Sequence, residues 1–124
     1  TELAQYMDKH EILPIAYSTL APIPNWREGS RWNGKPEDMK SGSMPCQDVA
    51  DNYNVTVPQL FLKWAIQLGY PVLPKSVKYD RLKENLELNH FEISREDIKK
   101  ISKIAKDNQK CLAWSGDFDP LEVE

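Results

Sequence analysis

The sequence predicts an α/β domain in which helices alternate with short strands of a parallel sheet. Two apolar runs of strand length, residues 12–17 and residues 71–74, stand between segments whose apolar side chains have helical spacing. Alternation of this kind is typical of βα units on a parallel sheet. Two parallel strands by themselves leave both sheet edges open, so we expect the chain to be one part of a larger sheet that further strands complete.

The first part of the chain is predicted to contain a helix, a strand and a long loop. Within residues 1–10, Leu3, Tyr6 and Met7 share one helical face, and the first strand follows directly. Residues 18–43 contain prolines and glycines and keep neither the period of a strand nor that of a helix. Loops of this length are uncommon in compact domains and are often binding loops or lids, so we expect 18–43 to serve a site.

Two helices are predicted between residues 45 and 69. Val49, Ala50 and Tyr53 give the segment 45–54 an apolar face. Thr56 and Gln59 then have the spacing of a capping box, in which an N-cap side chain and the side chain three residues later each bond the other's backbone. The helix that follows has an apolar stripe and ends before Gly69, a residue suited to the left-handed turn after a helix; the stripe is Leu60, Phe61, Trp64, Ala65 and Leu68.

The last part is predicted as strand, turn, helix and a further helix. After strand 71–74, Leu82 and Leu86 have helical spacing in the segment 75–86. Ser94, followed by Asp97, caps a final helix whose apolar face is Ile98, Ile101, Ile104 and Ala105. Residues 107–124 show no regular period and are predicted as an irregular tail.

Composition excludes several classes of protein. The formal net charge of -3 removes the basic field that attracts nucleic acid or anionic membranes, and no apolar run approaches the roughly 20 residues of a membrane span. Cys46 and Cys111 lie far apart, with only His10 and His90 as further soft ligands, so no metal site is expected. We therefore expect a cytoplasmic protein with reduced thiols and with neither nucleic-acid nor membrane partners.

A cluster of polar side chains follows the second strand, where the next helix is expected to begin. Lys75 supplies a cation, Ser76 a hydroxyl, and Arg81 a guanidinium that can grip a phosphate or stack on a base. Helix N-termini also offer backbone N–H groups to anions, and parallel barrels commonly bind phosphate at such a strand end. A single Lys or Arg on a helix surface is most often only solvated, and it is the combination that indicates a phosphorylated nucleotide.

The same residues form part of a longer pattern. Leu73-Pro74-Lys75-Ser76, with Arg81 and then Glu84-Asn85, resembles the C-terminal signature of the aldo-keto reductases. Residues 16–20 resemble that family's seventh strand and residues 56–59 the start of its next helix. The resemblance implies that residues 1–124 are the C-terminal part of a (β/α)8 TIM barrel, about two βα units plus an extra helix and the tail. The missing N-terminal part of that barrel is then an expected partner.

The resemblance also implies a site for NADP(H). Tyr17 takes the place of the tyrosine that stacks on the nicotinamide, with Ser18 and Leu20 beside the pyrophosphate. The remaining cofactor residues implied by the family pattern are Lys75, Ser76, Val77 and Arg81 around the adenosine 2′-phosphate, and Glu84 and Asn85 at the adenine. Thr19 departs from the proline common in the family, which predicts a less rigid bend after Ser18.

The implied activity is reduction of an aldehyde or ketone to an alcohol with NADPH. The family's catalytic Tyr, Lys, Asp and His belong to the first half of its barrel, and no matching motif occurs here, so we expect no catalytic residue in this chain. Trp26 and Trp114 lie in the segments that shape the substrate mouth, where a small carbonyl compound is expected. Two alternatives stay open: an NADPH-binding barrel that acts as a sensor or partner subunit, and a fragment that is inactive alone.

Overall fold

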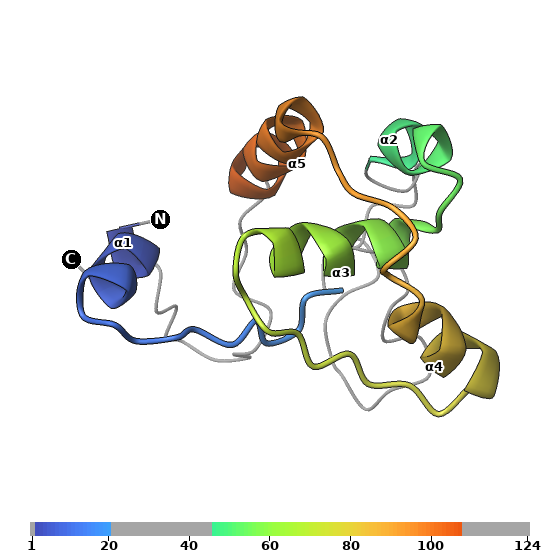
Figure 1. Cartoon of the computed structure of the whole chain (residues 1–124), viewed down its shortest axis with the longest axis horizontal. Coiled ribbons are helices and arrows are strands. Elements are labelled where there is room, and N and C mark those ends of the chain that lie inside the picture. Colours follow the sequence, from blue (N-terminus) through green and yellow to red (C-terminus); the bar gives the residue numbers. More distant parts are fainter. Residues whose placement is uncertain (1, 21–45, 108–124) are drawn as a thin grey trace, which may run out of the picture.

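The computed structural model describes residues 2–20 and 46–107, with the side chains of 46–106 in the second range. Figure 1 shows α3 in the middle, α2 and α5 on one side of it, α4 on the other side, and α1 set apart. The bounds of the helices are α1 Glu2–Lys9, α2 Gln47–Asn52, α3 Val57–Gln67, α4 Tyr79–Leu86 and α5 Arg95–Asp107. Helix α3 contacts both α2 and α4, and it therefore organises the described part of the chain.

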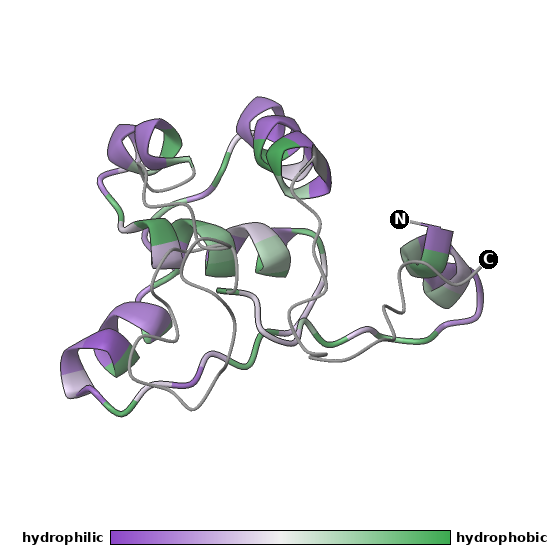
Figure 2. Cartoon of the chain, turned by 180° about the vertical axis from the view of Figure 1, so that it is seen from behind, coloured by the Kyte–Doolittle hydropathy of each residue, from purple (hydrophilic) through white to green (hydrophobic). Residues whose placement is uncertain are grey.

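The core is centred on α3. Leu60 and Leu62 of α3 are fully buried, together with Val49 of α2 and Ile101 of α5. The connection from α4 to α5 closes the cluster with Leu88, Phe91 and Ile93. Figure 2 shows this difference by hydropathy: α3 is largely apolar, whereas α2, α4 and α5 carry many hydrophilic residues. Burial of these side chains is the main stabilising term of this small core.

Both ends of α3 are built as the sequence predicts. At the N-terminus the Thr56 hydroxyl accepts from the backbone N–H of Gln59 at 3.3 Å, and the side-chain oxygen of Gln59 accepts from the backbone N–H of Thr56 at 3.1 Å. At the C-terminus Gly69 has a φ of +87°. Its N–H bonds to the Ile66 carbonyl, and the Tyr70 N–H bonds to the Ala65 carbonyl. This pair of bonds is a Schellman motif, so the capping box and the glycine stop are confirmed.

The start of α5 is also confirmed, and a distant residue reinforces it. The Ser94 hydroxyl accepts from the Asp97 N–H at 3.1 Å and donates to the Asp97 carboxylate at 2.9 Å. The Tyr53 hydroxyl, just after α2, accepts from the Ser94 N–H at 2.9 Å and donates to the same carboxylate at 2.7 Å. The local cap of α5 is therefore tied to the end of α2.

The parallel direction predicted for the two strands is confirmed, but their predicted lengths are wrong. In the described ranges 2–20 and 46–107 they are reduced to one parallel bridge between Ala16 and Val72, in which the Ala16 N–H donates to the Pro71 carbonyl at 2.8 Å. The apolar side chains of the two segments are largely exposed: Ile12 46%, Leu13 66%, Ile15 56% and Leu73 68%. Because further strands and covering helices are what bury such runs in parallel sheets, the segments stay extended without forming longer ladders here.

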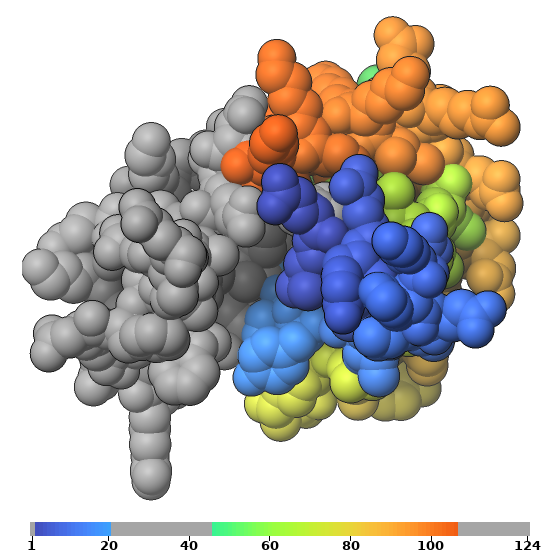
Figure 3. Space-filling view, turned by 90° about the vertical axis from the view of Figure 1, so that its left-hand side faces the viewer, coloured from blue at the N-terminus to red at the C-terminus, as the bar shows by residue number. Residues whose placement is uncertain are grey.

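Helices α4 and α1 contribute no buried residue to the core. Helix α4 begins at Tyr79, after the predicted turn, and Leu82 and Leu86, which have helical spacing, are 41% and 80% exposed. Helix α1 has no buried residue, and Figure 3 shows it lying on the outer surface.

No helix in the described ranges is long and apolar enough to cross a membrane. Residues 21–45 and 108–124, with most of the predicted loop and nearly all of the tail, lie outside the described residues.

Candidate functional site

The Ala16–Val72 bridge determines where the predicted cofactor residues lie. Because the pairing is parallel, the two segments run in the same direction and leave the bridge on the same side. Residues 17–20 directly follow Ala16, and residues 75–77 begin three positions after Val72. The structure therefore brings two of the predicted groups, separated by more than fifty residues in sequence, to one end of the pairing.

The first group forms a tight turn directly after the bridge. Tyr17 is 76% exposed, so its ring is open to a flat ligand. Ser18 has a φ of +55°, in the left-handed region, and the Thr19 hydroxyl donates to the Ala16 carbonyl at 3.1 Å. That bond closes the turn at the position where the sequence predicted a loss of rigidity. Leu20 differs from its neighbours because it packs partly buried against the core cluster.

The second group is the turn that precedes α4. Lys75 is exposed, and Val77 is 83% exposed. The Ser76 hydroxyl accepts from the Lys78 N–H at 3.1 Å and donates to the Lys78 carbonyl at 3.4 Å. The donated bond is long, so the hydroxyl hydrogen can be exchanged at little cost for a charge-assisted bond to an anion.

The third group lies on α4. Arg81 is exposed, and Glu84 and Asn85 are half-buried on the following turn. Lys78, the N-cap residue, gives no side-chain bond to the helix, so the first N–H groups of α4 have no such partner. Helix N-termini of this kind attract anions, although Asp80 in the first turn already supplies one negative charge.

The cations of these groups are not neutralised by neighbouring carboxylates. Among the residues that the structure describes, the ion pairs join Lys83 to Glu87 and Lys100 to Asp48, and neither Lys75 nor Arg81 takes part in one. An anionic ligand at Lys75 or Arg81 therefore displaces no ion-pair partner that the described residues provide. This arrangement suits a phosphate better than a neutral ligand.

The groups with shifted pKa values lie elsewhere, around α2. The hydrogen bond from Lys100 lowers the pKa of Asp48 and, reciprocally, raises that of Lys100. Burial and then the negative charge of Asp48 raise the pKa of the Cys46 thiol, which favours the protonated, unreactive form. In the described ranges no group of His, Cys, Asp and Glu side chains could hold a metal ion.

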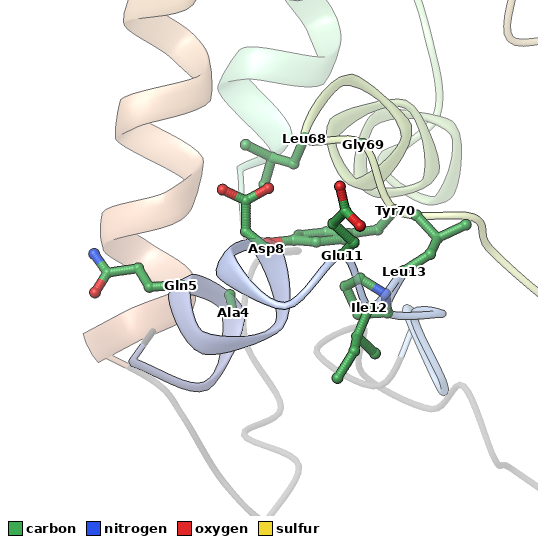
Figure 4. Close-up of a pocket in the computed structure, with 10 residues that line it drawn as sticks. Ala4, Gln5, Asp8, Glu11, Ile12, Leu13, Leu68, Gly69 and Tyr70 are labelled. Atoms are coloured by element: carbon green, nitrogen blue, oxygen red, sulfur yellow. The ribbon is translucent and has the colours of Figure 1, made fainter.

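A surface cleft of about 580 Å³ lies between α1 and the turn that follows α3. Figure 4 shows Asp8, Glu11, Leu13, Leu68 and Tyr70 among the residues around it. None of the predicted cofactor residues lines this cleft. It is therefore separate from the three groups that follow the bridge.

Sequence reasoning missed the side-chain contacts that join α3 to the α4 region and to the segment before α5. The Gln59 amide donates to two backbone carbonyls of the α4 region, and Gln67 bonds both backbone groups of Ile93. The capping box identified Gln59, but it gave no sign that the other end of the same amide reaches 25 residues along the chain. Trp26 and Trp114, the predicted substrate residues, lie outside the described residues.

Comparison with known proteins places the chain in a family. The family model of the aldo/keto reductase family matches residues 1–106. An NADPH-dependent D-xylose reductase from Meyerozyma guilliermondii is 42% identical over 121 residues, which are 98% of this chain and 38% of that protein. An NADP-dependent D-sorbitol-6-phosphate dehydrogenase from Malus domestica is 37% identical over 89% of this chain and 34% of its own length. The chain thus spans little more than a third of these relatives.

Solved structures give the same result for the fold. An aldo/keto reductase from Brucella melitensis matches 83% of this chain and 34% of its own, with a TM-score of 0.61 and 27% identity. A variant of Gox0644 in complex with NADPH matches 99% of this chain and 38% of its own, with a TM-score of 0.66 and 23% identity. These neighbours are (β/α)8 barrels, which supports the predicted α/β class. From the match over residues 1–106 and the identity to these reductases, the chain belongs to the aldo/keto reductase family.

Proposed function

We infer that this chain is the cofactor-binding C-terminal part of an NADP(H)-dependent aldo-keto reductase barrel. The observation that carries the proposal is the parallel bridge between Ala16 and Val72, which sends residues 17–20 and residues 75–77 to one end of the pairing. Ligands of parallel α/β folds bind beyond the carboxyl ends of the strands, which is where both groups lie. The D-xylose reductase relative, named as NADPH-dependent, supports the choice of cofactor.

The chemistry of the residues fits NADP(H). Lys75 and Arg81 offer two cations that have no ion-pair partner within residues 2–20 and 46–106, and Ser76 offers a hydroxyl, to the adenosine 2′-phosphate, with Val77 beside them. The other assignments are Glu84 and Asn85 to the adenine edge, the exposed Tyr17 ring to the nicotinamide, and Ser18 and Leu20 to the pyrophosphate. When bound, the cofactor supplies the hydride, and the residues of this chain hold and orient it.

The proposed reaction of the whole protein is reduction of a small carbonyl compound to an alcohol. Relatives are named as reductases of D-xylose and glyoxal, which are carbonyl compounds of this size. The proton donor and its supporting Lys, Asp and His are assigned to the remainder of the barrel. Trp26 and Trp114 are proposed to contact the substrate at the mouth of the site.

The remainder of the barrel is also the proposed partner of the exposed strand segments. Leu13, Ile15 and Leu73 are each more than half exposed, although strands of a parallel sheet are ordinarily covered on both faces. Adjacent strands on either side of the bridge would bury these side chains and extend the single pairing into ladders. The same closure would place the residues that follow the bridge at the rim of a complete barrel.

The test is a chimera in which this chain replaces the matching segment of the D-xylose reductase from Meyerozyma guilliermondii, so that a full barrel is present. NADPH and NADH are titrated by quenching of tryptophan fluorescence. Lys75→Met should weaken NADPH binding by about 10- to 150-fold and NADH binding much less, because a charge-assisted hydrogen bond is worth roughly 1.5 to 3 kcal/mol and NADH has no 2′-phosphate. Arg81→Ala should weaken both cofactors, since a guanidinium that stacks on adenine serves both.

The matched control is Lys103→Met, which removes the same charge from the exposed face of α5. It should change neither affinity by more than about twofold, as expected for a distant surface charge. Equal weakening of NADPH and NADH by Lys75→Met, or no weakening of either, contradicts the assignment of Lys75 to the 2′-phosphate. Absence of NADPH binding by the unmodified chimera contradicts the proposed function as a whole.

A further inference from the structure

Helix α4 carries three of the proposed nucleotide residues but is weakly anchored by its own side chains. It has no buried residue, and its apolar side chains are exposed: Tyr79 78%, Leu82 41% and Leu86 80%. Figure 1 shows α4 at the margin of the molecule, beside one end of α3. Packing of apolar side chains, which holds most surface helices in place, therefore contributes little here.

Gln59 supplies the contact that α4 lacks. Its side-chain N–H2 donates to the carbonyls of Glu84 at 3.2 Å and of Glu87 at 3.1 Å. These are carbonyls at the C-terminal end of α4, where a helix has no partners of its own for its last four carbonyls. In the described ranges these are the side-chain hydrogen bonds that join α4 to the core helix α3.

Only one orientation of the Gln59 side-chain amide satisfies its hydrogen bonds. The Gln59 side chain is 7% exposed, so each of its polar atoms needs an internal partner. Its oxygen accepts from the Thr56 N–H in the capping box, and its nitrogen faces two carbonyl oxygens. Reversing the amide would set oxygen against oxygen and nitrogen against N–H, so the side chain is locked at both ends.

We propose that Gln59 is a positioning residue for the nucleotide site: it sets the place of α4 and thereby the affinity for the adenosine 2′-phosphate part of NADP(H). The inference rests on the proposed function, because it takes Arg81, Glu84 and Asn85 as ligand residues. One of the two carbonyls that Gln59 holds belongs to Glu84 itself. A small displacement of groups that bind a ligand costs affinity even when the groups are unchanged.

Gln67 provides a matched control on the same helix. Its side chain accepts from the Ile93 N–H at 2.8 Å and donates to the Ile93 carbonyl at 3.1 Å. Replacing either glutamine by glutamate keeps the acceptor and removes the N–H2 donor. Gln59→Glu therefore removes both bonds to the α4 carbonyls, whereas Gln67→Glu removes the bond to the Ile93 carbonyl, keeps the bond from the Ile93 N–H and leaves α4 attached.

The experiment uses the full 124-residue chain, isotope-labelled for NMR, with adenosine 2′,5′-bisphosphate as the probe. Gln59→Glu should weaken binding of the probe by about 5- to 30-fold, the equivalent of one to two hydrogen bonds, and Gln67→Glu by no more than about twofold. The backbone N–H groups of Leu82 and Glu87 bond to the carbonyls of Lys78 and Lys83 at the two ends of α4, and their hydrogen exchange should be about tenfold faster in Gln59→Glu than in Gln67→Glu. If Gln59 contributed only to overall stability, the two variants would have similar affinities for the probe and similar exchange rates in α4.

Equal affinities and equal α4 exchange in the two variants overturn the inference. If the unmodified chain binds the probe and Gln59→Glu binds it as tightly, the inference fails while the proposed function stands. If the unmodified chain shows no binding, the same two variants are compared in the chimera, where absence of probe binding by the unmodified protein contradicts the proposed function and equal affinities of the two variants overturn the inference. Should Gln59→Glu not fold, the pair Gln59→Met and Gln67→Met repeats the comparison without a buried charge, and Thr56→Ala removes the helix cap while keeping the link to α4.

Discussion

The hydroxyl of Tyr53 donates a 2.7 Å hydrogen bond to the carboxylate of Asp97, which lies 44 residues further along the chain. The same hydroxyl accepts from the Ser94 N–H at 2.9 Å, so it completes the N-terminal cap of α5 from outside that helix. The end of α2 and the start of α5, which are far apart in sequence, are thus joined by one side chain.

Removing this hydroxyl should destabilise the fold. Tyr53→Phe keeps the ring and its contact with Phe91 but leaves the Ser94 N–H and the Asp97 carboxylate with fewer partners. We expect the free energy of unfolding to fall by about 1 to 2 kcal/mol, measured by urea denaturation followed by circular dichroism. Tyr79→Phe is the control, because Tyr79 is 78% exposed and its hydroxyl has no hydrogen bond among the described residues. Equal midpoints for the two variants would show that the Tyr53 hydroxyl contributes nothing.

Gly69 should be costly to replace for a purely conformational reason. Its φ of +87° lies in the left-handed region, and a Cβ built there meets no atom within 4 Å. Gly69→Ala therefore introduces no clash beyond its own backbone, and we expect a loss of about 1 to 2 kcal/mol. Gly69→Asn should lose less, because asparagine tolerates this conformation better. A Gly69→Ala protein as stable as the unmodified chain in thermal unfolding would mean that the helix end has relaxed to another turn.

The ion pair of Asp48 and Lys100 should make stability depend on pH. Lys100 lowers the pKa of Asp48 below its ordinary value of 3.8, so the stabilisation is complete above that pH and is lost as the pH falls through the folded-state pKa. Asp48→Asn should therefore lower the melting temperature at neutral pH, and its difference from the unmodified chain should vanish in acid well below 3.8.

Both side chains of that pair are exposed, so high salt should also shrink the effect. Asp80→Asn is the matched control, since Asp80 occupies the first turn of α4 as Asp48 does that of α2 but has no ion-pair partner among the described residues. An Asp48→Asn effect that persists in strong acid, or that equals the Asp80→Asn effect at every pH, would exclude the ion pair as its source.

The chain alone should not reduce carbonyl compounds. A positioned proton donor typically contributes about 10² to 10⁴ in rate, and the proposed donor lies in the remainder of the barrel. The measurement is NADPH consumption with D-xylose or glyoxal by purified chain, compared with the chimera that supplies the rest of the barrel. Steady turnover by the 124-residue chain, free of host reductases, would contradict the assignment of the catalytic groups to the missing part.

The sequence by itself determined the features that depend on neighbours along the chain. The Thr56–Gln59 capping box, the stop at Gly69 and the Ser94–Asp97 cap are all present, because each needs only residues within five positions of one another. Lys75, Ser76 and Arg81 can be predicted as phosphate-binding residues for the same reason, because the prediction depends only on residue types at a fixed spacing. Their roles stay predictions.

Only the tertiary structure decided which distant groups meet. Apolar composition predicted two strands, yet their length depends on neighbouring strands, and a single Ala16–Val72 bridge forms here. Leu82 and Leu86 have helical spacing, yet Leu86 is 80% exposed, and hydrogen bonds from Gln59 join α4 to α3. Burial and long-range hydrogen bonds depend on what the rest of the fold presents to a side chain, and that information is not contained in the spacing of residues along the chain.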